Sequence, residues 1–249
     1  MLRRSIIAAL AFAALAALAA GSARAQGPCI DFNDHASFVD YCSSHGKISK
    51  GTETFEEGVI PPAGKDCFPS PLGPAPMPPH FPNGLAVQNI IIQDNIEPGP
   101  GPIPLNPSGN ACALYLIGTG FIGANSNKVG EDLFLTGTPA SIDIIFTEYD
   151  KTGVGFNLSR FQGFPNGGWI VTVYNTANVP ISQYTVPAPT GNEPDKEFFG
   201  VWCAPAIGRI NIFDVAGLAP DALDNIESWV DVATAARHST WGELKLSYR

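Results

Sequence analysis

The fold is constrained most by residues 130–229, where short segments of alternating apolar and polar residues are separated by Gly, Pro and Asn. In the segment 168–174, for example, Trp169, Val171 and Val173 recur at every second position. A period of two places one apolar set on a single face of a β-strand. Several such strands, separated by turn residues, are typical of two packed antiparallel sheets. We therefore predict an all-β, jelly-roll-like antiparallel β-sandwich.

The other strands are placed by the same alternation and by the positions of proline. Residues 60–84 are rich in proline, which lacks a backbone donor and is excluded from central strands. We expect this segment to be an extended surface wrap or a mobile loop, and 97–109 to be a second Pro/Gly loop. The predicted strands are 52–57, 85–93, 111–117, 132–135, 140–146, 154–158, 168–174, 180–186, 196–203, 207–213 and 225–230.

The first 25 residues have the composition of a bacterial export signal. Two arginines, Arg3 and Arg4, precede the unbroken apolar run 6–20, and Ala23-Arg24-Ala25 fits a signal-peptidase site. The apolar run is too short to cross a bilayer comfortably. We expect the mature chain to begin at Gln26 and to be secreted or held at the cell surface.

The chain is predicted to have four parts: a signal peptide at 1–25, an N-terminal appendage at 26–51, the β-sandwich domain at 52–230 and a C-terminal tail at 231–249. A short helix is expected in the appendage, with Asn33 or Asp34 as its N-cap. The formal net charge is −9, and no basic cluster is present. Nucleic acid and anionic membrane are therefore unsuitable partners, and we expect no transmembrane segment in the mature chain.

All five cysteines lie in the mature part, where an oxidising compartment makes disulfides the default. Cys29 and Cys42 are close in sequence and bracket a small element, so we predict a bond between them. A second bond is predicted between Cys67 and Cys112, across the proline-rich region. Cys203, inside an apolar run, would then be the buried unpaired thiol.

Zinc is the alternative for the appendage. The residues Cys29, His35, Cys42 and His45 offer two sulfurs and two nitrogens, which is a common ligand set for zinc. Their spacing matches no standard zinc finger, and exported thiols oxidise. Disulfide formation is therefore the preferred interpretation.

A series of short motifs resembles the β-sandwich domain of exported bacterial proteins with C-terminal sorting tags, of which PEP-CTERM proteins are the commonest. The motifs are Gly123-Ala-Asn-Ser126, Asp143-Ile-Ile-Phe146, Val154-Gly-Phe-Asn157, Trp169-Ile-Val-Thr-Val-Tyr174, Phe198-Phe-Gly-Val201, Ile207-Gly-Arg-Ile210 and Leu223-Asp-Asn-Ile226. The resemblance covers about residues 52–230 and implies a non-catalytic extracellular domain. The chain lacks the apolar anchor and terminal basic cluster of the usual tag.

A structural calcium ion is implied by a more distant resemblance to carbohydrate-binding jelly rolls. Those domains often hold Ca²⁺ between an early Glu and a late Asp, which places Glu56 and Asp224 at the site, with Asp221 nearby. Calcium takes six to eight oxygen ligands, and the first and last strands of a sandwich are often neighbours. The alternative is that Asp224 and Asn225 stabilise a turn through side-chain to backbone hydrogen bonds.

The loop 159–167 offers a candidate glycan site. Its residues Arg160, Phe161, Gln162, Phe164 and Asn166 combine two aromatic rings with a guanidinium and two amides. Sugar rings stack on aromatic faces and hydrogen-bond to such polar groups. The alternative is that both phenylalanines fold inward and close the end of the sandwich.

Catalysis has little support in the sequence. A Gly-x-Ser-x-Gly motif is missing, and all four histidines lie outside the predicted strands. We therefore predict a non-catalytic binding protein for glycan or another surface component, with structural calcium as its candidate cofactor. A secreted, carboxylate-dependent glycan hydrolase or lyase and a structural envelope or matrix protein are the alternatives.

Overall fold

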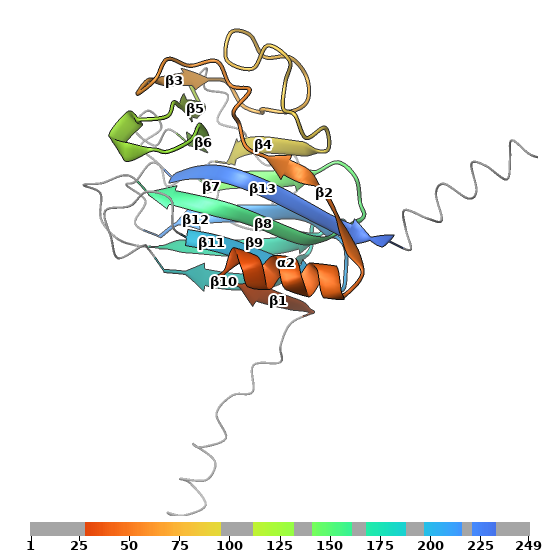
Figure 1. Cartoon of the computed structure of the whole chain (residues 1–249). Coiled ribbons are helices and arrows are strands. Elements are labelled where there is room, and N and C mark those ends of the chain that lie inside the picture. Colours follow the sequence, from red (N-terminus) through yellow and green to blue (C-terminus); the bar gives the residue numbers. More distant parts are fainter. Residues whose placement is uncertain are drawn as a thin grey trace, which may run out of the picture.

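The computed structural model describes residues 28–95, 112–131, 141–160, 168–187, 197–215 and 221–232. These residues form two antiparallel sheets, the α-helix α2 (His35–Ser44) and the short 3-10 helix η1 (Phe121–Gly123). The sheets stack face to face (Figure 1). The predicted antiparallel β-sandwich is confirmed.

The larger sheet has the strand order β1-β11-β8-β13-β6-β5-β3, and β2 also pairs with β13. All of its pairings are antiparallel. Its strands are β1 (Cys29–Phe32), β2 (Lys47–Glu53), β3 (Lys65–Phe68), β5 (Leu114–Ile117), β6 (Lys128–Glu131), β8 (Lys151–Arg160), β11 (Glu197–Cys203) and β13 (Asp221–Asp231).

The smaller sheet has the order β10-β9-β12-β7-β4 and is also antiparallel. Its strands are β4 (Ile90–Asn95), β7 (Ser141–Phe146), β9 (Trp169–Asn175), β10 (Pro180–Val186) and β12 (Ile207–Asp214). The strands predicted at 140–146, 168–174, 180–186, 196–203 and 207–213 all agree with the structure to within one residue at each end.

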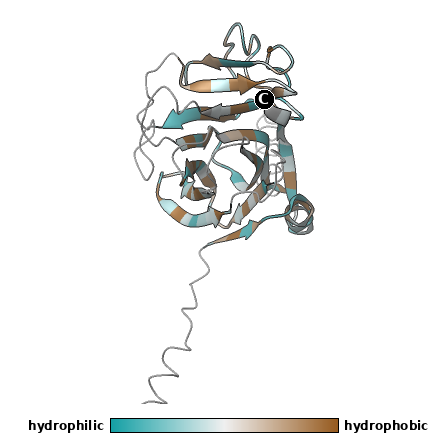
Figure 2. Cartoon of the chain, turned by 90° about the vertical axis from the view of Figure 1, so that its left-hand side faces the viewer, coloured by the Kyte–Doolittle hydropathy of each residue, from teal (hydrophilic) through white to brown (hydrophobic). Residues whose placement is uncertain are grey.

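The core lies between the sheets and is built from the alternating positions. The larger sheet contributes Val154 and Phe156 of β8, and the smaller sheet contributes Val171 and Val173 of β9; all four side chains are fully buried in one apolar cluster. Figure 2 shows apolar and polar residues alternating along the strands. The period of two in the sequence therefore corresponds to the inward and outward faces of the sheets.

Helix α2 of the N-terminal segment packs on the outer face of the larger sheet. Asp34 is the N-cap of helix α2 and accepts a hydrogen bond from the Ser37 backbone N–H. It is one of the two residues predicted for this role. Phe38 is fully buried against that sheet. Gly155 and Gly200 are opposite each other in β8 and β11, and a Cβ on either would lie 2.9 Å from Phe38 ring atoms. Glycine at these two positions makes room for the helix.

The disulfide predicted between Cys29 and Cys42 is wrong. Cys29 is directly opposite Cys203 in the β1–β11 ladder, with the Cα atoms 4.0 Å apart, and these two form the bond. Cys42 is the free thiol, because it points from helix α2 into the buried cluster with Phe38. Burial raises the pKa of Cys42 to about 12.

The second predicted disulfide, Cys67–Cys112, is confirmed. The alternative zinc site fails because the Cys29 sulfur is used in a disulfide. Among the described residues, no group of three or more His, Cys, Asp and Glu could hold a metal ion. Over the same residues, no helix is long and apolar enough to cross a membrane.

Several predicted boundaries differ from the structure. The strand expected at 52–57 is β2, which ends at Glu53 because Phe55 has a φ of 56° and starts a turn. Phe55 is nevertheless buried in the main core. Strand β4 begins at Ile90, after a turn, and the strand expected at 132–135 lies outside the described residues.

The proline-rich segment 60–84 is a packed wrap. It contributes strand β3 and buries Phe68, Leu72 and Phe81 in the main core. Leu72 forms an isolated bridge with Ile92 of β4. The segment therefore closes one end of the sandwich while using few ladder hydrogen bonds.

Candidate ligand-binding groove

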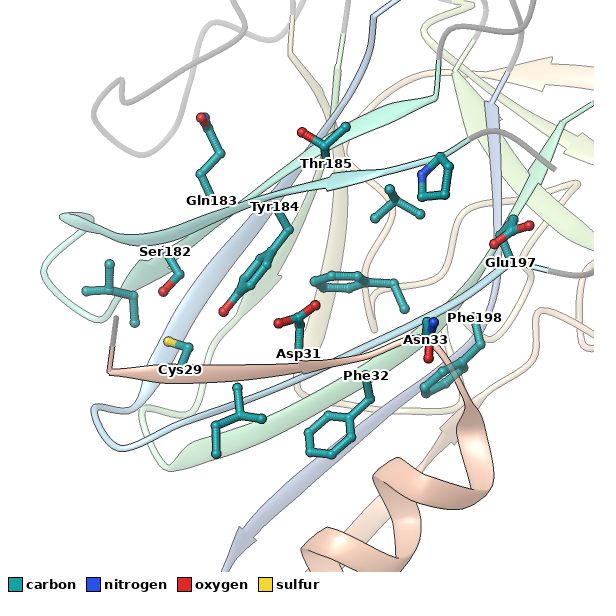
Figure 3. Close-up of a pocket in the computed structure, with 15 residues that line it drawn as sticks. Cys29, Asp31, Phe32, Asn33, Ser182, Gln183, Tyr184, Thr185, Glu197 and Phe198 are labelled. Atoms are coloured by element: carbon teal, nitrogen blue, oxygen red, sulfur yellow. The ribbon is translucent and has the colours of Figure 1, made fainter. Parts of the chain in front are cut away.

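A groove of about 800 Å³ lies between the two sheets, where β1 is the edge of one sheet and β10 the edge of the other (Figure 3). Strand β11, the neighbour of β1, contributes Glu197, Phe198 and Phe199. The volume is within the range of about 300–1,000 Å³ that is common for ligand sites. The groove is therefore a side opening of the sandwich.

The lining residues run consecutively along each edge strand. They cover 29–33 on the β1 side and 181–187 on the β10 side. A groove across the face of a sheet is lined by alternate residues, because successive side chains point to opposite faces. Because consecutive residues line this groove, the open edges of β1 and β10 border it. At these edges the backbone N–H and C=O groups are not used in the sheet ladders.

Tyr184 and Asp31 project toward each other from the two walls (Figure 3). Tyr184 is half-buried, and its ring centroid is 5.5 Å from that of Phe199. Burial raises the pKa of Tyr184, and the negative charge of Asp31 raises it further. The phenol is therefore neutral and presents an aromatic surface with a hydroxyl group.

The groove has acidic and neutral polar groups but no basic side chain among the residues that line it. Asp31 and Glu197 supply the two carboxylates, and burial raises the pKa of Glu197. Asn33 and the hydroxyl groups of Ser182 and Tyr184 supply neutral donors and acceptors. This combination suits a polar, uncharged or cationic ligand.

A second polar cluster spans the outward face of the smaller sheet. In one cross-strand row, Gln93, Asp143, Asn211, Thr172 and Gln183 are successive partners on the five strands. The first four are buried, so this row is not an open site.

The centre of that cluster is an ion pair between Arg209 and Asp143. The guanidinium Nη1 donates to Asp143 Oδ1 at 2.7 Å, and both side chains are fully buried. Asn211 donates to the same carboxylate oxygen at 2.8 Å, and the Arg209 guanidinium lies 3.6 Å from the Tyr174 ring centroid. Because a buried charge needs such partners, the cluster serves the fold.

The structure brings Glu56 and Asp224 of the predicted calcium site to one segment, 126–128. Glu56 accepts a hydrogen bond from the Asn127 backbone N–H. Asp224 is buried, with its Oδ2 3.1 Å from the Lys128 ammonium. Its other oxygen accepts from the Asn225 backbone N–H, which is the turn role considered as the alternative.

The Lys128 ammonium therefore neutralises the Asp224 carboxylate. Only the backbone of Asp221, in β13, is described. Calcium binding by Glu56, Asp221 and Asp224 stays a prediction.

The predicted glycan loop lies outside the described residues from Phe161 to Gly167, so Phe161, Gln162, Phe164 and Asn166 cannot be placed. Arg160 is the last residue of β8, and only its backbone is described. The glycan role of this loop stays a prediction.

Sequence reasoning missed the groove between β1 and β10. One signal was present: β10 carries polar residues on both faces, including Ser182, Gln183 and Thr185, as an edge strand can. Strand β1 has four residues without a clear alternation and was not predicted.

No protein-family model and no curated protein matches the sequence. Among solved structures, the chain is similar to a cleaved adhesin domain of Lys-gingipain, with 15% identity, a TM-score of 0.39, and coverage of 72% of this chain and 96% of that one. It is also similar to a mutant of CBM29-2, a family 29 carbohydrate-binding module, with 13% identity, a TM-score of 0.29, and coverage of 57% and 92%.

Another mutant of that module, complexed with cellulohexaose, has 12% identity and a TM-score of 0.28, with coverage of 57% of this chain and 93% of that one. At these TM-scores the likenesses carry no argument about function. The functional argument therefore depends on the groove.

Proposed function

We propose that this chain is an exported, non-catalytic protein that binds a glycan chain in the groove between β1 and β10. The observation that carries the proposal is the pairing of the half-buried Tyr184 ring with polar side chains on both walls. Sugar rings have apolar faces that stack on aromatic rings and hydroxyl groups that hydrogen-bond around their rims.

The polar groups of the groove match the rim of a sugar. Asp31 and Glu197 accept hydrogen bonds from hydroxyl groups, while Asn33 and Ser182 both donate and accept. The backbone edges of β1 and β10 add further donors and acceptors along the groove. An extended, hydroxyl-rich ligand can therefore bind along the length of the two strands.

Export is part of the same proposal. The two disulfides, Cys29–Cys203 and Cys67–Cys112, support an oxidising compartment. The predicted signal peptide supports the same route. Retention at the cell surface, as in the sorting-tag proteins that the sequence resembles, is proposed on that resemblance alone.

The test is calorimetric titration of the processed chain with a panel of neutral oligosaccharides, followed by Tyr184→Ala. We expect the variant to bind an active oligosaccharide about tenfold more weakly, because the stacking surface is lost. Tyr184→Phe keeps the ring and should retain most of the affinity. Tyr149→Ala is the control, since Tyr149 is 70% exposed on the turn before β8 and does not line the groove.

Two results would oppose the proposal. Equal affinities of the wild-type chain and Tyr184→Ala, or no binding across the panel, would remove the groove as a glycan site. Release of reducing sugar during the titrations would favour the alternative of a glycan hydrolase.

A further inference from the structure

The charges in the groove are of one sign. Figure 3 shows 15 lining residues, of which Asp31 and Glu197 are acidic and none is Lys, Arg or His. The two carboxylates lie on different strands, with Asp31 near Tyr184 and Glu197 at the start of β11. A ligand along the groove therefore meets negative charge at two separate points.

Neither carboxylate is neutralised by the protein. Within the described part of the chain, Asp31 and Glu197 make no hydrogen bond or ion pair with a side chain. By contrast, three buried acids have side-chain partners: Asp143 pairs with Arg209, Asp224 with Lys128, and Glu227 with His35. The exposed Asp31 and the half-buried Glu197 are therefore both available to a cation that arrives with the ligand.

On the basis of the proposed glycan function, we propose that the groove prefers cationic amino sugars, in which free amines replace hydroxyl or acetamido groups. An ammonium group on the ligand donates charge-assisted hydrogen bonds to Asp31 and Glu197. The Tyr184 ring favours the same charge through a cation–π contact. Uronic acids and sulfated sugars place like charges beside the two carboxylates and are rejected.

The experiment compares three probes of equal length: an oligomer of glucosamine, the same oligomer N-acetylated on every amine, and an oligomer of galacturonic acid. Calorimetry uses the processed chain, at a pH where the sugar amines are protonated and the groove carboxylates are ionised. We expect the glucosamine oligomer to bind about tenfold tighter than its acetylated form. The galacturonate oligomer should not bind measurably, and added salt should weaken only the glucosamine complex.

Asp31→Asn and Glu197→Gln separate the charge preference from the glycan function. We expect each variant to reduce the preference for free amines, and the double variant to abolish it, while affinity for the acetylated oligomer is retained. Asp40→Asn, an exposed acid on helix α2 outside the groove, is the matched control and should change nothing.

The two hypotheses fail in different ways. Equal affinity for the free and acetylated oligomers, with both affinities sensitive to Tyr184→Ala, would overturn the charge preference and leave the glycan function standing. Failure of every probe to bind would oppose the proposed function itself. A preference for the amine that persists in the double variant would place the cationic site elsewhere.

Discussion

Glu53 is a fully buried acid at the end of β2. Its two carboxyl oxygens accept hydrogen bonds from the backbone N–H groups of Phe55 and Val87, each at 2.9 Å. Burial, followed by the hydrogen-bonded carboxyl of Glu57, raises the pKa of Glu53 to about 7. Glu53 and Glu57 therefore share a proton in the folded state at mildly acidic pH.

The free energy of unfolding should fall as the pH rises through the range between the two pKa values of Glu53. In the unfolded chain the ordinary value is 4.5, so between that pH and about 7 the folded state holds a proton that the unfolded state has released. The stabilisation from this proton is greatest near pH 4.5 and is lost once the pH exceeds about 7. Glu57→Gln removes the neighbouring charge but leaves Glu53 buried, so it should reduce this slope and make the variant more stable than wild type by about 1 kcal/mol at pH 8.

Urea unfolding at a series of pH values measures this slope. Asp40→Asn is the control because Asp40 is exposed and makes no contact with the pair. A slope that is the same in wild type and Glu57→Gln would show that the two glutamates are not coupled.

At the scale of elements, the alternation in the sequence predicted the central strands because their inward positions are all apolar. Strands β7, β9 and β12 are of this kind. Strands β1 and β2 were missed or displaced because they pair at exposed positions, where the apolar pattern is weak. The pairing of Cys29 depends on the β1–β11 register, a long-range contact that sequence proximity to Cys42 does not reveal.

The disulfide Cys29–Cys203 fixes β1 as one wall of the groove. The double variant Cys29→Ser/Cys203→Ser should lose about 2–5 kcal/mol of stability, since the bond closes a long segment of chain. The double variant should also bind an active oligosaccharide more weakly, because β1 is then held to β11 only by the four residue pairs of their ladder. Denaturant unfolding and calorimetry measure the two effects.

The matched control is Cys67→Ser/Cys112→Ser, which opens the other disulfide away from the groove. That variant should lose stability and keep its affinity for oligosaccharide. Equal loss of affinity in both double variants would indicate a general effect of destabilisation.

At the scale of the whole molecule, the N-terminal segment 28–53 is part of the larger sheet. Strand β1 forms one edge, β2 pairs with β13, and helix α2 covers Phe198 and Trp229. The sequence suggested an appendage because this segment precedes the regular strands and has few apolar positions. Its packing depends on Gly155 and Gly200, which lie more than a hundred residues away, so local patterns could not predict it.

This arrangement predicts that the sandwich does not fold without its N-terminal segment. A chain that begins at Thr54 loses a partner of β13, one wall of the groove and the cover over Phe198 and Trp229. We expect it to bind hydrophobic dye and to show no cooperative urea transition, whereas the chain beginning at Gln26 unfolds cooperatively. Phe38→Ala, which removes only the helix contact, should fold and lose about 3 kcal/mol. Cooperative unfolding of the shortened chain at the same urea concentration would instead make residues 28–53 a dispensable appendage.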